Sequence, residues 1–263
     1  MPRSPSNDPT PAAEASRDFV AGLERGLAVI CAFDEGRPRL TISEVADLCG
    51  LSRAAARRYL LTLQHLGFVR SERHMFALTA KVLRLGQSYM QSSVLPRLVE
   101  PELHRLAQDL KEASSAGVLD GDDVICIAAT TAGRVVSRTL QPGTRVPAWC
   151  TANGRVLVAA MPAVDSAAWV ARQRFERLTP HTITSTTALT AEIERTRDLG
   201  YADIDQELEP GLRTLSVPLA GRSGIVRAAI NVSVSADRFS MTKLIEPCLP
   251  PLRQAQKKLR PLL

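Results

Sequence analysis

The sequence predicts an α+β protein of two domains, on the strength of three observations. Over residues 41–78, two helical patterns are separated by a turn of three or four residues and followed by a short hairpin pattern. Beyond residue 98, helix and strand patterns alternate in a way that favours a mainly antiparallel sheet flanked by helices. The 263 residues, 45% hydrophobic and 23% charged, suffice for two separate cores.

The N-terminal segment gives no pattern of folded structure before the first helix. Residues 1–18 are rich in Pro, Ser and Ala without an apolar run, which predicts a disordered tail. Residues 19–33 carry Leu23, Leu27, Ile30 and Phe33 at helical spacing and predict the first helix. We expect a cytoplasmic protein, since there is neither a signal-peptide core nor a stretch long enough to span a membrane.

The five cysteines fit the same compartment. They are odd in number, widely spaced and set in apolar surroundings, so we expect reduced core residues and no disulfide. They are Cys31, Cys49, Cys126, Cys150 and Cys248.

Residues 41–67 have the pattern of a helix-turn-helix. Thr41 and Glu44 are spaced as a capping box, which marks the start of the first of the two helices. Gly50 is placed to end that helix and Ser52 to cap the next, and Gly67 ends the second helix. Residues 68–70 and 76–78 are expected to pair around a polar SERH turn, so residues 19–80 predict a winged helix-turn-helix domain.

The second of these helices combines small residues with arginines and is the expected recognition helix. Residues 50–84 contain seven Lys/Arg and one acid, a net charge of +6 that equals the net charge of the whole chain. A basic turn, helix and wing are typical of a domain that binds double-stranded DNA. The alternatives are a solvated surface helix and a sensor or scaffold module whose winged domain binds protein. The candidate DNA contacts are Ser52, Arg53, Ala55, Arg57, Arg58, Arg70, Arg73 and His74.

The remaining patterns predict a linker helix over residues 81–94 and a second domain over residues 95–263. The linker helix could pack in an ordinary core or against a second copy of the chain. Helices are expected at 99–112, from about 151 onward, at 187–199 and at 242–259, and strands at 115–119, 124–130, 135–140, 201–207, 212–219 and 227–234.

Several motifs in this order carry a resemblance that covers nearly the whole chain. They are LERGLAVI, LSRAAARRYLLTLQHLGFV, GTRVPAWCTANGRVLVA, DQELEPGLRTLSVPL and VRAAINVSVS. Together they resemble the IclR family of bacterial transcriptional regulators. The pairing of RVPAWCTANGRVL with DQELEPGLRTLSVP is most similar to the subgroup that controls catabolism of protocatechuate, para-hydroxybenzoate and related β-ketoadipate pathway compounds.

This resemblance implies a C-terminal effector domain of GAF-like shape, with a curved antiparallel sheet that encloses a small organic acid. It also implies a regulator that acts on a DNA operator. We expect a homodimer or a tetramer, because one recognition helix contacts only a few base pairs. Four scattered histidines and the lack of a C-x-x-C motif argue against a metal site, and no cofactor is expected. The family's binding residues fall here on Val135, Ala152, Asn153, Asp205, Leu212, Thr214, Asn231 and Ser233.

Four of these positions have their own physical reasons to bind an acid. Ala152 and Asn153 stand at a predicted helix N-terminus, where free N–H groups favour a carboxylate. Asn231 and Ser233 lie two apart on a strand and therefore point to the same face.

The chain also departs from the regulators that bind glyoxylate or pyruvate. Those regulators have a cysteine at the position of Thr214 and a serine at that of Asn231, which argues against a two- or three-carbon acid. Arg138 is placed either to meet a carboxylate bidentately, which would suit an aromatic or dicarboxylic acid, or simply to face solvent. Trp149 is expected in the core rather than stacked on the effector.

No pattern of catalytic residues supports an enzyme. The alternating acids Asp203, Asp205, Glu207 and Glu209 are expected to form a solvated strand face. Cys150 and His181 lack the orienting context of a nucleophile and its base. The sequence contains no G-x-S-x-G, H-E-x-x-H or phosphate-binding glycine loop.

Overall fold

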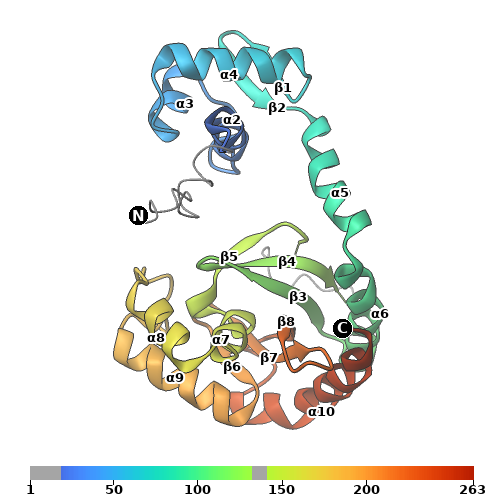
Figure 1. Cartoon of the computed structure of the whole chain (residues 1–263). Coiled ribbons are helices and arrows are strands. Elements are labelled where there is room, and N and C mark those ends of the chain that lie inside the picture. Colours follow the sequence, from blue (N-terminus) through green and yellow to red (C-terminus); the bar gives the residue numbers. More distant parts are fainter. Residues whose placement is uncertain (1–18, 132–140) are drawn as a thin grey trace, which may run out of the picture. The chain divides into compact units, whose positions relative to one another are not determined.

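The computed structural model describes residues 19–131 and 141–263, and the chain divides into two compact units, residues 1–88 and 89–263 (Figure 1). Within the described residues, no helix combines the length and apolar character needed to cross a membrane. The expected strand at 135–140 lies outside the described residues.

The first unit has the winged helix-turn-helix order predicted from the sequence. Helices α2 (Ala21–Cys31), α3 (Ile42–Leu48) and α4 (Arg53–His65) precede the antiparallel hairpin of β1 (Val69–Glu72) and β2 (Met75–Leu78). The capping box is confirmed, because the Thr41 hydroxyl accepts from the Glu44 N–H and the Glu44 carboxylate accepts from the Thr41 N–H. The core of this unit is built from Val29, Leu40, Val45, Ala46, Ala56, Leu60, Leu63, Val69 and Phe76.

Helix α4 begins and ends at the residues that the sequence indicates. The Ser52 hydroxyl accepts from the Ala55 N–H at 3.2 Å. At the other end Gly67 has a φ of +79°, and the N–H groups of Gly67 and Phe68 donate to the carbonyls of Gln64 and Leu63. This is the Schellman arrangement, which a glycine adopts without steric cost.

The wing differs from the prediction in the length of its turn. Ser71 and Glu72 belong to β1, and only Arg73 and His74 form the turn, with φ of 49° and 66°. Two successive residues with positive φ make a type I′ turn, whose twist matches that of the strands it joins. The two strands of the wing are therefore longer than predicted, because the turn between them has two residues rather than four.

The predicted linker segment consists of a 3₁₀ turn, η1 (Ala80–Val82), followed by α5 (Leu83–Ser92). The next helix, α6 (Val94–Leu110), begins earlier than expected. The reason is Pro96, which the sequence analysis placed outside any helix but which lies in the first turn of α6. The N–H groups of a first turn have no partner within the helix, so a proline costs nothing there.

The second unit is built on a six-stranded antiparallel sheet in the order β5-β4-β3-β8-β7-β6. The strands are β3 (Ala113–Asp120), β4 (Asp123–Thr130), β5 (Arg145–Pro147), β6 (Ala202–Asp205), β7 (Leu212–Ala220) and β8 (Val226–Ser235). Strand β8 alternates in character, since Ile230, Val232 and Val234 belong to one core while Asn231 and Ser233 point to the other face.

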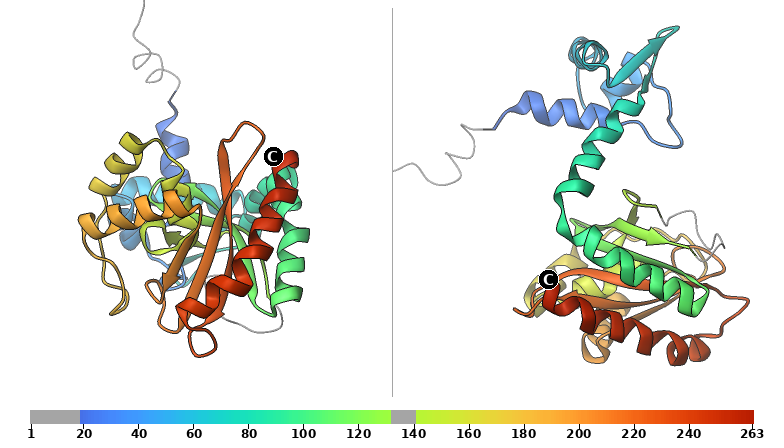
Figure 2. Two further views of the ribbon diagram at one scale, coloured as in Figure 1. Left: turned by 90° about the horizontal axis from the view of Figure 1, so that it is seen from below. Right: turned by 90° about the vertical axis from the view of Figure 1, so that its right-hand side faces the viewer.

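Helices cover both faces of this sheet (Figure 2). On one face, α6 and α10 (Met241–Leu259) pack on the larger core. On the other face are η2 (Ala148–Cys150), α7 (Ala152–Ala159), α8 (Ala163–Ala171) and α9 (Thr186–Leu199), and the 3₁₀ turn η3 (Arg260–Leu262) follows α10. Helix α8 was not predicted. Four of its nine residues are alanines, so its sequence, AVDSAAWVA, shows only a weak helical periodicity of apolar and polar residues.

Two expectations about side-chain environment are wrong. Cys126, Cys150 and Cys248 are buried as expected, but Cys31 is exposed, because it is the last residue of α2, and Cys49 is half-buried. The alternating acids do not form a solvated face: Asp203 pairs with Arg195, Asp205 with Arg213, and Glu207 is only 6% exposed.

The burial of Glu207 is explained by Arg155, a charged residue that is itself only 1% exposed inside α7. An Arg155 guanidinium nitrogen lies 2.7 Å from Glu207 Oε2, and Nε donates to the Trp149 carbonyl at 3.3 Å. The same Glu207 oxygen accepts from the Ile183 N–H at 3.2 Å. Burial raises the pKa of the Glu207 carboxyl, while Arg155 opposes that rise. This ion pair ties α7 to the loop between β6 and β7.

We predict that Arg155→Met destabilises the protein by about 3–5 kcal/mol, because it leaves a buried carboxylate without its countercharge. Adding Glu207→Gln should recover at least half of that loss, since no charge then remains buried and the Ile183 N–H keeps an acceptor. The Arg155→Met penalty should be full at neutral pH and shrink as the pH falls toward 4.5, the ordinary glutamate value, because burial raises the pKa of Glu207 in the folded state. Urea denaturation across this pH range measures both effects; a double variant no more stable than the single one would contradict the assignment.

A second prediction concerns Gly154, which lies where α7 touches η2. A Cβ at this position would fall 2.0 Å from the Ala148 carbonyl oxygen and 2.4 Å from its Cα, and main chain cannot yield as a flexible side chain does. Gly154→Ala should therefore cost at least about 2–3 kcal/mol of unfolding free energy. Gly86→Ala in α5 is the matched control, because its Cβ would meet nothing within 4 Å, and it should be neutral or stabilising by roughly 0.5–1 kcal/mol. Thermal denaturation of the two variants would reveal the contrast.

Candidate functional site

The N-terminal half of α4 presents a free basic surface. Ser52, Arg53, Arg57 and Arg58 are exposed, and Ala55 is half-buried. None of the three arginines forms an ion pair with any residue that the structure describes, so their guanidinium groups are available to an anionic partner. Arg53 and Arg57 are four apart and so share one face of the helix.

The wing supplies the remaining candidate DNA contacts. Arg73 and His74 are exposed at the two-residue turn, and Arg70 is exposed on β1. Glu72, the one acid in residues 50–84, has an oxygen 3.7 Å from a guanidinium nitrogen of Arg39. Arg39 was not predicted from the sequence, because its place beside the wing follows from an isolated bridge between Leu40 and Phe76.

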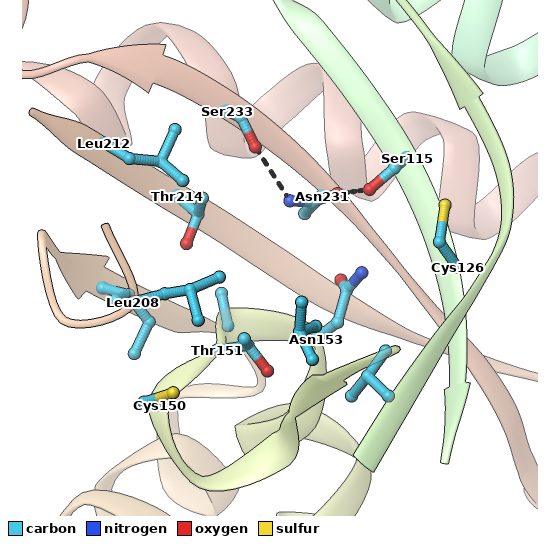
Figure 3. Close-up of a pocket in the computed structure, with 14 residues that line it drawn as sticks. Ser115, Cys126, Cys150, Thr151, Asn153, Leu208, Leu212, Thr214, Asn231 and Ser233 are labelled. Carbon is cyan, nitrogen blue, oxygen red and sulfur yellow. Dashed lines mark hydrogen bonds between the residues drawn. The ribbon is translucent and has the colours of Figure 1, made fainter. Parts of the chain in front are cut away.

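A cavity lies in the second unit between the N-terminus of α7 and the sheet (Figure 3). Its volume is about 60 Å³, which is room for a few water molecules at roughly 10–15 Å³ each. We call it the α7 cavity, and it is lined by Ser115, Val124, Cys126, Val146, Cys150, Thr151, Ala152, Asn153, Ile204, Leu208, Leu212, Thr214, Asn231 and Ser233.

Six of the residues predicted to bind an effector line this cavity: Ala152, Asn153, Leu212, Thr214, Asn231 and Ser233. Asp205 does not line it, because Arg213 holds the carboxylate with Nε 2.7 Å from Oδ1. This contact lowers the pKa of the Asp205 carboxyl. Val135 and Arg138 lie outside the described residues. Trp149 belongs to the core, as expected, with its ring perpendicular to that of Phe175 at 5.4 Å.

On the sheet side, polar side chains form a directional hydrogen-bond chain. The Ser115 hydroxyl donates to Asn231 Oδ1 at 2.5 Å, at the short end of the range for an O–H···O bond. The amide oxygen of Asn231 therefore faces Ser115, and its nitrogen donates to Ser233 Oγ at 3.1 Å. No described residue accepts from the Ser233 O–H or from the second Asn231 N–H, so both can donate. Ser115 could have been found from the pairing of β3 with β8, in which it is the register partner of Asn231.

Two further donors face the cavity beside this chain. Thr214 is 8% exposed, and its hydroxyl, which makes no hydrogen bond with any described residue, points into the cavity (Figure 3). Asn153 Oδ1 accepts from the Ser216 hydroxyl at 2.7 Å, which leaves its Nδ2 hydrogens free.

The N-terminus of α7 forms the opposite wall. The Thr151 hydroxyl accepts from the Gly154 N–H at 3.2 Å and caps the helix. The N–H groups of Ala152 and Asn153 occupy the first two helical positions, which have no partner within a helix. Together with the helix dipole, they favour an anion at this end of the cavity.

No ionisable acid or base other than cysteine is among the described lining residues. Burial raises the pKa of the Cys126 thiol to about 11 and that of Cys150 to about 12, so both thiols are protonated at neutral pH. Cys150 Sγ instead contacts the Pro147 carbonyl at 3.6 Å. A buried protonated thiol is a poor nucleophile, so the arrangement supports binding rather than covalent chemistry.

Comparison with known proteins agrees with this arrangement along nearly the whole chain. The model of the IclR helix-turn-helix domain matches residues 22–73, and that of the bacterial transcriptional regulator IclR C-terminal domain matches residues 87–260. The Pca regulon regulatory protein of Pseudomonas putida is 40% identical over 243 residues, which cover 92% of this chain and 84% of that protein.

Solved structures show the same fold. A putative transcriptional regulator from Rhodococcus sp. RHA1 superposes with a TM-score of 0.78 at 41% identity, over 92% of this chain and 97% of that one. The inducer-binding domain of a PobR double mutant from Acinetobacter, in complex with 3-hydroxybenzoic acid, superposes with a TM-score of 0.61 at 28% identity, over 65% of this chain and 100% of that one. With a winged helix-turn-helix, a curved sheet that carries a cavity, and both domain models matched in order, the chain belongs to the IclR family of bacterial transcriptional regulators.

Proposed function

We propose that this DNA-binding regulator senses a small organic acid, aromatic or of the β-ketoadipate pathway, in the α7 cavity and thereby controls catabolic genes. The observation that carries the proposal is the cavity's surplus of neutral hydrogen-bond donors. Free N–H and O–H groups come from Ala152, Asn153, Thr214, Asn231 and Ser233, whereas no described lining residue offers a free carboxylate. Such a site suits an oxygen-rich anion.

The two polar walls suggest how an acid of this kind is held. A carboxylate placed at the N-terminus of α7 would accept from the Ala152 and Asn153 N–H groups. A second oxygen, such as a ring hydroxyl, would then meet the Ser115–Asn231–Ser233 chain, where hydroxyl oxygens can accept its proton. Apolar residues, including Val146 and Leu208, supply the contact that a ring requires.

Relatives point to the same chemistry. One is named for the Pca regulon, and another was solved with 3-hydroxybenzoic acid. Thr214 and Asn231 stand where regulators of glyoxylate and pyruvate are expected to carry cysteine and serine, which disfavours two- and three-carbon acids here. We expect no catalytic activity, since the cavity holds no activated nucleophile or base among its described residues.

We further propose that Ser52, Arg53, Ala55, Arg57, Arg58, Arg70, Arg73 and His74 contact operator DNA, and that the cytoplasmic protein acts as a homodimer or a tetramer. One recognition helix reads only a few base pairs, and two-fold symmetry doubles the site. Helix α2 supports this, because Leu23 and Leu27 are 63% and 48% exposed on an apolar stripe suited to a second copy.

The effector proposal is tested at Thr214. Protocatechuate or para-hydroxybenzoate should raise the melting temperature of the wild type in a thermal-shift panel that also contains β-ketoadipate, glyoxylate and pyruvate. Thr214→Val should leave the unliganded protein as stable as the wild type, because this hydroxyl has no described partner, while weakening the binding of the acid about 10-fold or more. Thr187→Val on the exposed surface of α9 is the matched control. If both variants bound the acid with equal affinity, Thr214 would not contact the acid.

The DNA-binding surface is tested by removing two charges from α4. Arg57→Ala/Arg58→Ala should weaken binding to the upstream intergenic DNA and lower the slope of log affinity against log salt by about 2, if each arginine contacts one phosphate. Arg222→Ala/Lys257→Ala removes the same charge from the second unit and should leave the slope unchanged. A gel shift across salt concentrations measures both. Wild-type protein that fails to bind this DNA would favour a winged domain that binds protein.

A further inference from the structure

Lys81 belongs to the basic segment of residues 50–84, yet the structure gives it an internal partner. Its ammonium group donates to the Leu66 carbonyl at 2.7 Å and lies 5.3 Å from the centre of the Phe68 ring. The Lys81 side chain also runs past Gly67: a Cβ atom added at Gly67 would lie 3.6 Å from Lys81 Cδ. The charge is therefore directed at the end of α4.

Thr79 binds the two carbonyls that follow. Its hydroxyl donates to the Gly67 carbonyl at 2.6 Å, and its N–H donates to the Phe68 carbonyl at 2.9 Å. Thr79 also caps η1, because its hydroxyl accepts from the Lys81 N–H at 3.3 Å. Three successive carbonyls at and just beyond the end of the recognition helix are thus held by Thr79, which caps η1, and by Lys81, which lies within η1.

The chemistry of this contact is that of a helix C-terminus. The last carbonyls of an α-helix lack partners within the helix and carry partial negative charge, so a cation beside them is favourable. Lys81 meets this need at α4. It does so from within η1, the 3₁₀ turn that runs directly into α5, and none of the side chains of α5 is buried.

We propose that Lys81 and Thr79 are positioning residues that clamp the start of the linker segment to the end of the recognition helix, so that a change in α5 is transmitted to α4. This inference rests on the proposed ligand-responsive function. It assigns Lys81 a role in the response to the effector rather than in contact with DNA phosphates.

The test compares variants of the full-length protein by fluorescence anisotropy on upstream intergenic DNA, with and without protocatechuate and para-hydroxybenzoate. The readout is the ratio of the two DNA affinities, which for allosteric proteins is typically about 5- to 150-fold. Thr79→Val/Lys81→Met should reduce this ratio at least about threefold. Lys81→Arg, which keeps a cation able to reach the carbonyl, should retain it. Arg84→Met is the control: it removes a positive charge three residues away, and the Arg84 side chain makes no described contact. This variant should also leave the ratio unchanged.

The salt dependence separates the clamp from a direct DNA contact. The salt slope of Lys81→Met should equal that of the wild type, whereas a slope lower by about one would identify a phosphate contact and overturn the proposal. An unchanged affinity ratio in the double variant would overturn it too, as would an equal loss of affinity with and without the acid, which a merely structural role produces. Wild type that binds DNA but responds to neither acid would instead contradict the proposed sensing function, and the clamp with it.

Discussion

The α7 cavity depends on how firmly helix α7 is fixed against the sheet. Two features fix it. Gly154 has no side chain, so α7 can lie against the main chain of Ala148, and Arg155 of α7 forms a buried ion pair with Glu207. The Glu207 oxygen that receives Arg155 also receives the Ile183 N–H, so one carboxylate joins α7 to two loops. Leu208, which lines the cavity, directly follows Glu207. The ion pair thereby places both the helix N-terminus and another part of the cavity lining.

A cavity without a described cation can still bind an anion if its dipoles are fixed in advance. The α7 N–H groups are fixed by the helix, and the Asn231 amide is fixed because Ser115 occupies its oxygen. Water would have to reorganise to offer the same donors, so a site of this kind gains affinity by preorganisation rather than by net charge. It also gains selectivity, since an amine or another cation would find no compensating carboxylate among the described lining residues.

The parts of the fold that could be predicted from the sequence are those specified by near neighbours. The capping box at Thr41, the cap at Ser52 and the glycine that ends α4 each act within four residues, and all are present in the structure. Residues two apart on β8 were likewise placed correctly on one face. Prediction failed where the partner is remote: Glu207 is neutralised by a residue 52 positions away, and alternation along a strand cannot reveal that. Asp205 was assigned to the cavity from the resemblance, but Arg213, across the β6–β7 pair, occupies its carboxylate.

The same distinction applies to the basic segment. Its net charge treats every cation as free, but Lys81 donates to the Leu66 carbonyl, and Glu72 lies beside Arg39, a cation from outside the segment. Arg39 offsets the acid, while Lys81, although exposed, has its ammonium group directed at a main-chain carbonyl. Charge counting therefore sets an upper limit on phosphate contacts. Arg53, Arg57 and Arg58 remain the free charges of α4, and because each lies within the first two turns of that helix, the electrostatic attraction for DNA is concentrated at its N-terminal end, away from the clamped C-terminus.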